Sequence, residues 1–583
     1  MIKSAGKLLR YVGEYKKATI ITLIFIMGEV GLEVLIPRIT SNLVDVIQED
    51  ADISQIIMFG VAMVLAAVSS LLCGCVAGVA CSRASAGFAK NLRLTMFKRV
   101  QDFSFGNIDK FSTSSLVTRM TTDVNNVQNA YMMTIRTAVR APFMLVLTII
   151  AAFSVGGQLA MTFVIVIPVL VFGFIIIGKL ALPAFRAVFK KYDKLNESVE
   201  ENVRGIRVVK GFAREEFEKK KFNFASGDIK KDFTWAERVV GMNMPLMQLC
   251  IYFNSVFILY VGSKMIIESA GETINVGQVS ALLTYGMMIL MSLMMLSMIY
   301  IMLTMSVESV KRIAEVLDEE PGISNPENPV FEIADGSIDL EDVVFKYSDE
   351  AKRDALYDID LHIDPGMTVG ILGGTGSGKT SLIQLIPRLY DVNSGCVKVG
   401  GVDVREYDIT ALRDAVSVVL QKNVLFSGTI RENLMWGNKD ATDEEIKEAA
   451  RLAQAEDFIL SFPDGYDSKI EQGGTNVSGG QKQRLCIARA LLKKPKILIL
   501  DDSTSAVDTR TDALIRKGFR EYIPETTKII IAQRVASVQD ADLIVILDNG
   551  RIVGKGTHDE LLKTNSIYQE IYEQQVKGGD SDE

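Results

Sequence analysis

The stretch VGILGGTGSGKTSLI, residues 369–383, joins an apolar run of β type to a glycine-rich loop and then to a helical pattern. It contains the pattern G-x-x-x-x-G-K-[ST], whose glycines let backbone N–H groups converge on phosphate oxygens. We expect Lys379 to reach the β- and γ-phosphates of a nucleotide and the Thr380 hydroxyl to bind Mg²⁺. The stretch therefore predicts an α/β domain with a phosphate-binding loop. The residues of this loop are Gly373, Gly374, Thr375, Gly376, Ser377, Gly378, Lys379, Thr380 and Ser381.

A second motif, KILILDD at residues 496–502, has the pattern of a buried strand that ends in Asp501. In phosphate-loop ATPases an aspartate at this place orients the ligand shell of Mg²⁺, which we expect here to act through water. The two motifs together predict the binding of ATP and Mg²⁺. The chain has 583 residues, enough for several domains, and its net charge of -8 gives no indication of a nucleic-acid partner.

The first half of the chain contains apolar runs long enough for spanning helices, which need about 20 residues each. The links between the second and third runs and between the fourth and fifth are rich in Lys and Arg, so we expect these links, both termini and the soluble half in the cytoplasm. Both links show helical periodicity, which predicts helices that extend into the cytoplasm and meet in short turns near residues 120–130 and 209–217. The six predicted spans cover residues 18–40, 55–81, 138–157, 159–182, 242–267 and 276–305.

These patterns predict a multidomain chain. Residues 1–315 form an all-α transmembrane domain of six helices with long cytoplasmic extensions, which makes the lipid bilayer a partner. A proline-rich linker follows at residues 316–335 and leads to an α/β phosphate-loop nucleotide-binding domain at residues 336–575. Residues 576–583 form a polar tail.

Two acids lie inside the first predicted span. Glu29 and Glu33 are four residues apart, so they share one face of a helix. Acids inside a membrane are costly and usually face a cavity or a partner. The two acids therefore predict a site for a cationic substrate or a proton, and the alternatives are structural pairing with another span or a position near a wet interface. Arg136 and Arg140 are expected to anchor the cytoplasmic end of the third span by snorkelling.

The sixth predicted span is rich in methionine, including Met291, Met295 and Met298. Methionine side chains adapt to varied ligands, so these residues are candidates for a substrate cavity together with Glu29 and Glu33. Ordinary apolar packing of the helix is the alternative.

The segment NVSGGQKQRLCIARAL, residues 476–491, resembles the signature segment of ABC transporters, which is usually LSGGQ. Other elements of that family follow the same order along this chain. Tyr347 matches the aromatic residue that stacks on adenine, Gln421 matches the glutamine that also contacts Mg²⁺, and Asp508 in STSAVD matches the D-loop. The signature residues here are Val477, Ser478, Gly479, Gly480 and Gln481.

The resemblance covers the whole chain and implies a half-transporter of the bacterial multidrug-exporter type in the plasma membrane. In that family two chains pair and sandwich two ATP molecules. Each ATP contacts the phosphate loop of one chain and the SGGQ segment of the other. The two predicted cytoplasmic turns would then be the coupling helices.

Two positions depart from the family pattern. The residue after the Walker B aspartate is normally Glu, but here it is Asp502, and a displacement of about 1 Å can cost on the order of 100-fold in rate. The family's switch histidine is replaced by Gln533 in IIIAQR. An amide can donate a hydrogen bond but cannot carry the charge of imidazolium. Both departures predict a poorly active site.

Since the signature segment is intact, we expect this chain to be the degenerate-site subunit of a heterodimeric exporter. The partner would carry the catalytic Glu, the switch histidine and an altered signature segment. Its substrates would be amphipathic drugs, lipids or peptides. The alternatives are a homodimeric exporter with two slow sites, an importer built on the exporter fold, and an ATP-gated channel or regulatory protein.

Overall fold

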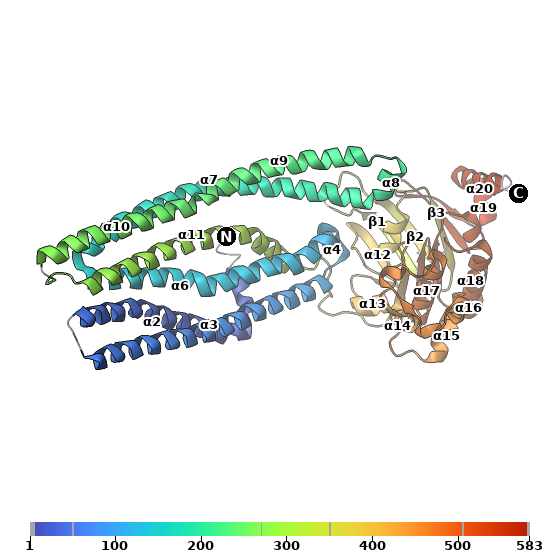
Figure 1. Cartoon of the computed structure of the whole chain (residues 1–583). Helices are drawn as coiled ribbons and strands as arrows, with labels where there is room; N and C mark the ends of the chain where they lie inside the picture. Colours follow the sequence, from blue (N-terminus) through green and yellow to red (C-terminus); the bar gives the residue numbers. More distant parts are fainter. Residues whose placement is uncertain (1–5, 49–51, 270, 349–350, 504–505, 580–583) are drawn as a thin grey trace. The chain divides into compact units, whose positions relative to one another are not determined.

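The computed structural model divides the chain into two compact units (Figure 1). The helical unit contains residues 1–101 and 113–319, and the α/β unit contains residues 102–112 and 320–583. The segment 102–112 therefore leaves the helices that flank it in sequence and packs with the α/β unit. The structure describes residues 6–48, 52–269, 271–348, 351–503 and 506–579, so residues 580–583 of the predicted tail lie outside it.

Long apolar helices make up the helical unit, as lipid requires when backbone groups must be satisfied within each segment. Among the described residues, five uninterrupted helical runs are long and apolar enough to cross a membrane. One run, Thr113–Arg204, contains both α6 and α7. The chain reverses between them at Gly157, where φ is 47°, and the 3₁₀ turn η3 keeps the run uninterrupted. The elements are η1 (Leu9–Tyr15), α2 (Lys16–Gln48), α3 (Ile53–Gln101), α5 (Thr113–Thr118), η2 (Arg119–Asp123), α6 (Val124–Gly156), η3 (Gly157–Ala160), α7 (Met161–Arg204), α8 (Ile206–Gly211), α9 (Glu215–Gly241), α10 (Asn243–Ser269) and α11 (Val276–Asp318).

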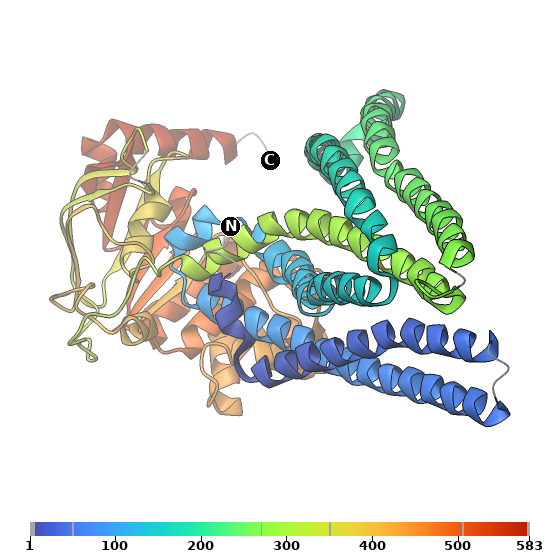
Figure 2. The same ribbon diagram turned by 90° about the vertical axis from the view of Figure 1, so that its left-hand side faces the viewer.

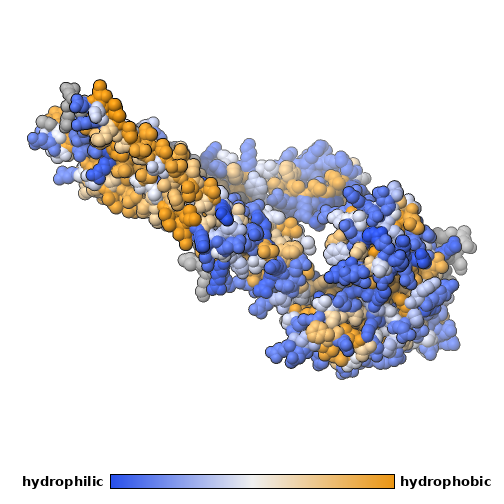
Figure 3. All heavy atoms as spheres, turned by 90° about the horizontal axis from the view of Figure 1, so that it is seen from below, coloured by the Kyte–Doolittle hydropathy of each residue, from blue (hydrophilic) through white to orange (hydrophobic). Residues whose placement is uncertain are grey.

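The long helices pair along their lengths. Helices α2 and α3 run side by side, α7 runs beside α9, and α6 lies against α11 (Figures 1 and 2). Hydrophobic residues cover a continuous band of the helical unit, with hydrophilic residues on either side of the band (Figure 3). Such a large exposed apolar surface indicates contact with lipid or with another membrane protein. On α3 the exposed apolar side chains include Ile57, Val61, Val64, Leu65, Val68, Leu71 and Leu72.

The first predicted cytoplasmic turn is wrong in position. Residues 120–130 are helical, because the π-helical turn η2 leads directly into α6. Asp123 does not cap a helix there; its carboxylate accepts hydrogen bonds from Ser309 and Arg312 of α11. The chain instead begins a new short helix at α4 (Phe105–Lys110), where Ser104 and Asn107 cap each other reciprocally. The second predicted turn contains residues 212–214, between α8 and α9.

The α/β unit is built on a parallel sheet with an antiparallel sheet beside it. The six-stranded sheet has the order β12-β11-β3-β10-β9-β6, with β12 antiparallel and the others parallel, and the four-stranded sheet has the order β2-β1-β4-β5. The strands are β1 (Ile338–Phe345), β2 (Leu356–Ile363), β3 (Thr368–Gly373), β4 (Ser394–Val399), β5 (Val402–Asp403), β6 (Val416–Val419), β7 (Gly428–Thr429), β8 (Lys469–Ile470), β9 (Ile497–Asp501), β10 (Thr527–Ile531), β11 (Leu543–Asp548) and β12 (Arg551–Gly556).

Helices and short 3₁₀ turns cover the six-stranded sheet, and their apolar side chains form a buried cluster with those of its strands. Every residue of β9 and of β10 is buried, which is typical of central parallel strands that are covered on both faces. The helices are α12 (Lys379–Leu385), α13 (Ile409–Ala415), α14 (Ile430–Leu434), α15 (Asp443–Leu452), α16 (Glu456–Ser461), α17 (Gly479–Leu492), α18 (Thr509–Tyr522), α19 (His558–Thr564) and α20 (Ser566–Gly579), with 3₁₀ turns η4 (Gly465–Asp467), η5 (Gln472–Gly474) and η6 (Val535–Ser537).

Candidate functional site

Four neighbouring parallel strands end at one edge of the six-stranded sheet. Their order is β3, β10, β9 and β6, and Ile531 of β10 pairs with Ile371 of β3 and with Asp501 of β9. The carboxyl ends of parallel strands form the usual ligand crevice of such sheets. This topology brings together the phosphate loop after β3, Gln533 after β10, the aspartates at the end of β9 and Gln421 after β6.

The phosphate loop has a backbone that only glycine adopts easily. Gly376 has a φ of 81° and Gly378 a φ of 101°, both in the left-handed region. A Cβ at position 378 would lie 2.9 Å from the carbonyl oxygen of Ala355. The Lys379 ammonium donates to the carbonyl oxygens of Gly373 and Gly374, each at 2.8 Å. Burial lowers the pKa of Lys379, and the charges of the nearby aspartates oppose that shift.

Two oxygen ligands suited to Mg²⁺ meet beside the loop. The Thr380 hydroxyl donates to Oδ2 of Asp501 at 3.1 Å. Asp501 is 3% exposed, and burial raises the pKa of its carboxyl while the bond from Thr380 opposes this. Hydroxyl, carboxylate and water oxygens are the ligands that Mg²⁺ takes in nucleotide sites. The residues present therefore fit the predicted metal.

The two residues that depart from the family pattern contact each other. Nε2 of Gln533 donates to Oδ2 of Asp502 at 3.0 Å. The backbone of Asp502 has a φ of 48°, and its N–H donates to the carbonyl of Ile531 at 3.0 Å. Burial raises the pKa of Asp502, and a hydrogen bond from Gln421 and the charge of Lys379 work against this shift. Asp502 stands at the position where the family has a glutamate, and one of its carboxylate oxygens is thus bonded to an amide.

The loop that carries Gln533 is held by the C-terminal helix α20. Oε1 of Gln575 accepts from the backbone N–H of Val535, and its Nε2 donates to the backbone carbonyl of Gln533, both at 2.8 Å. A side-chain amide that pairs with two backbone groups fixes the local conformation of the loop. Gln575 could not be predicted from the sequence, because nothing in its local pattern distinguishes it from other polar residues of α20.

Tyr347 lies beside the phosphate loop at the end of β1. Its hydroxyl forms a 2.8 Å hydrogen bond with the hydroxyl of Ser381. The ring packs edge-on against Tyr390, with a centroid distance of 5.2 Å. Since 47% of Tyr347 is exposed, part of its surface is accessible to a flat ligand such as a base.

A cavity of about 800 Å³ adjoins Tyr347 and the phosphate loop residues Gly376 to Ser381. Two arginines that the sequence pattern does not predict also line the cavity: Arg353 precedes β2 and Arg551 begins β12. Their positive charges suit an anionic ligand. The dipeptide Asn549-Gly550 is a hairpin-turn signal, and this turn brings Arg551 to the cavity.

The signature segment begins helix α17. The Ser478 hydroxyl accepts from the N–H of Gln481 at 3.3 Å, and the Gln481 side chain accepts from the N–H of Ser478 at 2.9 Å. This reciprocal pair is a capping box that starts the helix firmly. A Cβ at Gly480 would lie 2.8 Å from the carbonyl oxygen of Ala506, so glycine is required for that close approach. Val477, Gly479 and Gln481 lie on either side of Ser478 in this turn.

The predicted D-loop packs against the signature helix. The N–H of Ala506 donates to the side chain of Gln483 at 3.0 Å. Asp508 caps α18 by accepting from the N–H of Thr511 at 2.9 Å, and these hydrogen bonds lower its pKa. Residues 504–505 of the STSAVD segment lie outside the described residues.

The acids of the first predicted span are paired, and the snorkelling role predicted for Arg140 is wrong. Arg140 of α6 donates to Oε1 of Glu29 at 2.7 Å and to both carboxylate oxygens of Glu33 at 2.8 Å. Glu29 is 9% exposed, and Gly74 of α3 leaves room for its carboxylate. Such a pairing is favoured because a buried guanidinium and buried carboxylates cost less together than apart. The pairing ties α2 to α6.

The methionine candidates form a separate surface on α11. Met291, Met295 and Met298 are 52%, 41% and 72% exposed, respectively. Their spacing places them on one face of the helix. They remain candidates for a substrate surface.

Known proteins with similar sequences identify the family. The chain matches the description "ABC transporter transmembrane region" over residues 19–294 and the description "ABC transporter" over residues 356–505. It is 35% identical over 569 residues to the uncharacterized ABC transporter ATP-binding protein YfiB of Bacillus subtilis strain 168, covering 98% of both chains. The chain belongs to the ABC transporter family. Its α/β unit contains the ATP-binding domain of that family.

Other relatives of this ABC transporter have similar lengths. An uncharacterized ABC transporter ATP-binding protein of Mycobacterium tuberculosis strain CDC 1551 is 34% identical over 97% of both chains. The structure of a bacterial Atm1-family ABC exporter with ATP bound has a TM-score of 0.82 to this chain at 23% identity, covering 96% of this chain and 98% of that chain. The predicted fold class, a helical transmembrane domain followed by an α/β nucleotide-binding domain, is confirmed.

Proposed function

We propose that this ABC transporter is one subunit of a heterodimeric exporter of amphipathic drugs, lipids or peptides. It lies in the bacterial plasma membrane, with both termini and the nucleotide-binding domain in the cytoplasm. Its own phosphate-loop site holds ATP and hydrolyses it slowly. Its signature segment completes the active site of a second, non-identical half-transporter.

The hydrogen bond between Gln533 and Asp502 carries this proposal. A general base must direct a free carboxylate oxygen toward the attacking water. Here the side chain is one methylene shorter than glutamate, and Oδ2 accepts from the Gln533 amide at 3.0 Å. Gln533 in turn is a neutral donor where the family has a histidine that carries charge. The two replacements support each other as a pair that holds nucleotide without rapid turnover.

The chain's own residues perform the binding steps. The phosphate-loop amides and Lys379 bind the phosphates, and Tyr347 supports the base. Thr380, Gln421 and, through water, Asp501 would hold Mg²⁺, which would neutralise phosphate charge. The capped turn at Ser478 presents its hydroxyl and the amides of Gly479 and Gly480 to the partner's ATP. A helix N-terminus suits such an anion.

We propose helix α4, instead of residues 120–130, as the first coupling helix. Residues 212–214 belong to the second coupling helix. The Asn107 side chain donates to the carbonyl of Glu320 at 2.9 Å, and Asp109 accepts from the Tyr390 hydroxyl at 2.5 Å. Tyr390 also packs against Tyr347. A continuous chain of contacts within the α/β unit thus joins the adenine side of the ATP site to α4.

The test is to purify this chain alone and together with a half-transporter that has the complementary features. Mg·ATP turnover and the nucleotide that stays bound are measured in both preparations. We expect the chain alone to be nearly inactive, and the pair to hydrolyse ATP while it retains one unhydrolysed ATP. A brisk ATPase from the chain alone would mean that Asp502 is an adequate base and that the chain forms homodimers.

The direction of transport needs its own measurement. In sealed vesicles with the nucleotide-binding domain outside, an exporter accumulates an amphipathic dye in the lumen when ATP is added. Depletion of preloaded dye from the lumen would indicate import. An ATP-dependent ion current without accumulation of any solute would indicate a channel.

A further inference from the structure

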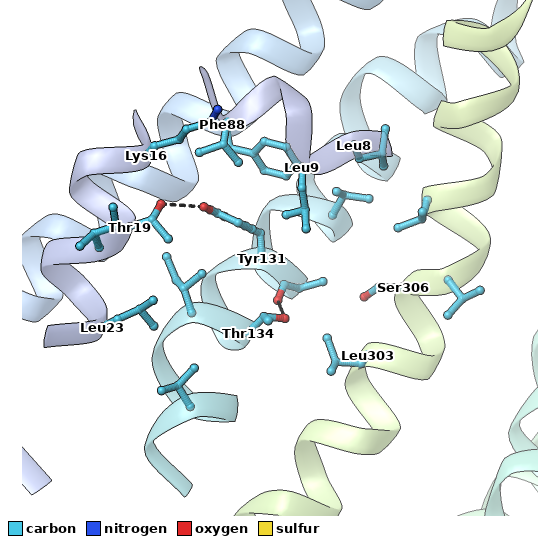
Figure 4. A pocket seen from close by; sticks show the side chains of 18 of the residues that line it. Leu8, Leu9, Lys16, Thr19, Leu23, Phe88, Tyr131, Thr134, Leu303 and Ser306 are labelled. Atoms are coloured by element: carbon cyan, nitrogen blue, oxygen red, sulfur yellow. Dashed lines mark hydrogen bonds between the residues drawn. The ribbon is translucent and has the colours of Figure 1, made fainter. Parts of the chain in front are cut away.

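A second cavity lies in the helical unit, apart from the acids and methionines discussed above. It has a volume of about 720 Å³, within the range of roughly 300–1,000 Å³ that small-molecule sites show. Side chains from the segment around η1 and from α2, α3, α6 and α11 line it (Figure 4). Most of these side chains are apolar, and they include Leu8, Leu23, Phe88, Ile135 and Leu303.

The hydroxyl groups of the cavity already have partners. The hydroxyls of Thr19 and Tyr131 bond to each other at 2.7 Å, as the dashed line in Figure 4 shows. Thr134 donates to the carbonyl of Ala130 at 2.7 Å, and Ser306 donates to that of Met302 at 3.1 Å. The cavity interior therefore offers few free hydrogen-bond donors, so it suits a hydrocarbon group.

Two lysines supply the charge of the cavity. Lys16 begins α2, and Lys311 lies near the end of α11. Lys311 pairs with Glu308 at 2.8 Å, but both side chains are exposed, and such surface pairs contribute little. Within the described residues, no carboxylate pairs with Lys16.

Each lysine is separated along its own helix from a leucine of the cavity, whereas other apolar lining residues, such as Val12, lie close to Lys16 in sequence. Leu23 is seven residues beyond Lys16, which is about 10 Å along a helix, and Leu303 is about 12 Å from Lys311 on the same basis. In Figure 4 the labelled Leu23 and Leu303 lie at the end away from Lys16. Beyond Leu23, α2 carries Glu29 and Glu33 against the single charge of Arg140, which disfavours an anion at that end.

We infer that this cavity binds a single-chain amphiphile with a carboxylate head group, taken up from the membrane. The head group contacts Lys16 and Lys311, and the hydrocarbon chain lies among the apolar side chains of α2, α6 and α11. The inference deepens the proposed export function by naming a ligand class, and it rests on that function only for the direction of transport.

The test measures equilibrium binding of radiolabelled dodecanoate to the full chain in nanodiscs of zwitterionic lipid, with empty nanodiscs as background. Dodecanol, which has the same chain without charge, is the matched ligand. We expect dodecanoate to bind at least tenfold more tightly than dodecanol. The double variant Lys16→Glu/Lys311→Glu should abolish this preference, and Lys17→Glu, an exposed lysine outside the cavity, should keep it.

A second variant locates the hydrocarbon chain. Ala130→Phe narrows the cavity and should weaken both ligands, while the carboxylate keeps its advantage. Equal binding of the two ligands, an unchanged preference after reversal of both lysines, or an equal loss in Lys17→Glu would overturn the inference. No ATP is present in these measurements, so their failure is distinct from a failure of the proposed ATPase asymmetry.

Discussion

The phosphate-loop side and the signature side of the α/β unit have diverged from the family pattern to different degrees. On the phosphate-loop side, the binding residues Lys379, Thr380 and Asp501 are in place. At the two positions where the family has a glutamate and a histidine for hydrolysis, this chain has Asp502 and Gln533. On the signature side, Ser478 begins a fully capped helix.

This difference separates two requirements that one ATP site normally meets together. Binding depends on amides, an ammonium and a metal ligand, whereas hydrolysis depends also on a base at the correct distance. A chain can lose the groups for hydrolysis and keep those for binding, provided that its partner has a site with both. The comparison predicts different effects for changes on the two sides.

The largest effect should follow Ser478→Ala in the co-purified pair. If this hydroxyl acts on the partner's ATP, its loss should lower the ATPase rate of the pair on the order of 100-fold, as the loss of a transition-state donor does. Nucleotide retained at this chain's own site should not change. The measurement is steady-state turnover together with quantification of bound nucleotide.

The control is Thr442→Ala, because Thr442 caps α15 by the same capping box. Each change removes a helix cap, at a cost of about 1 kcal/mol in stability. Only the Ser478 variant should lose turnover. Equal losses in both variants would show that capping, rather than catalysis, explains the effect.

An intermediate effect should follow Asp502→Glu combined with Gln533→His. The longer carboxylate and the histidine should raise turnover at this chain's site by about 10-fold or more, since a displacement of about 1 Å can cost on the order of 100-fold. Retained ATP should convert to ADP. Measurement of ATP and ADP in the purified pair, compared with each single variant, checks this prediction. Persistent unhydrolysed ATP in the double variant would contradict our account of the defect.

The smallest effect should follow Gln575→Ala. Without its two hydrogen bonds, the loop between Gln533 and Val535 loses a restraint, so bound ATP should dissociate about threefold faster, a difference of about 0.65 kcal/mol. Gln575→Glu keeps the acceptor for Val535 and loses the donor to Gln533, so its effect should be similar. Gln574→Ala, a change at the preceding residue, should leave dissociation unchanged. An equal change in the Gln574 variant would point to a general effect on α20.

Much of the site was predictable because the relevant signals are local. The phosphate loop, the strand ending in Asp501 and the signature segment each occupy a few consecutive residues whose types follow from backbone geometry and charge. The positions of Arg353, Arg551 and Gln575 were not predictable in this way. Asn549-Gly550 marks a turn before Arg551, but no local pattern shows that this turn, the segment of Arg353 or helix α20 packs beside the phosphate loop or the loop of Gln533.

The helical unit shows the same limit. Apolar runs predicted where long helices form, but periodicity alone placed a turn at 120–130, where the structure is helical. Asp123, a residue type that often caps helices, is instead held by Ser309 and Arg312 of a helix far along the chain. Arg140 likewise is a residue type that often anchors a helix at the membrane interface, yet it pairs with Glu29 and Glu33.

By itself, the sequence determined that this chain has apolar helices followed by a phosphate-loop domain, and that Asp502 and Gln533 depart from the family pattern. These features depend on residue type, spacing and order, which can be read from the sequence without knowledge of the fold. Only the tertiary structure decided that Gln533 bonds to Asp502, that Gln575 holds the loop of Gln533 and that Arg140 pairs with both Glu29 and Glu33. Those outcomes depend on distances between segments that are remote in sequence, which the packing of sheets and helices fixes.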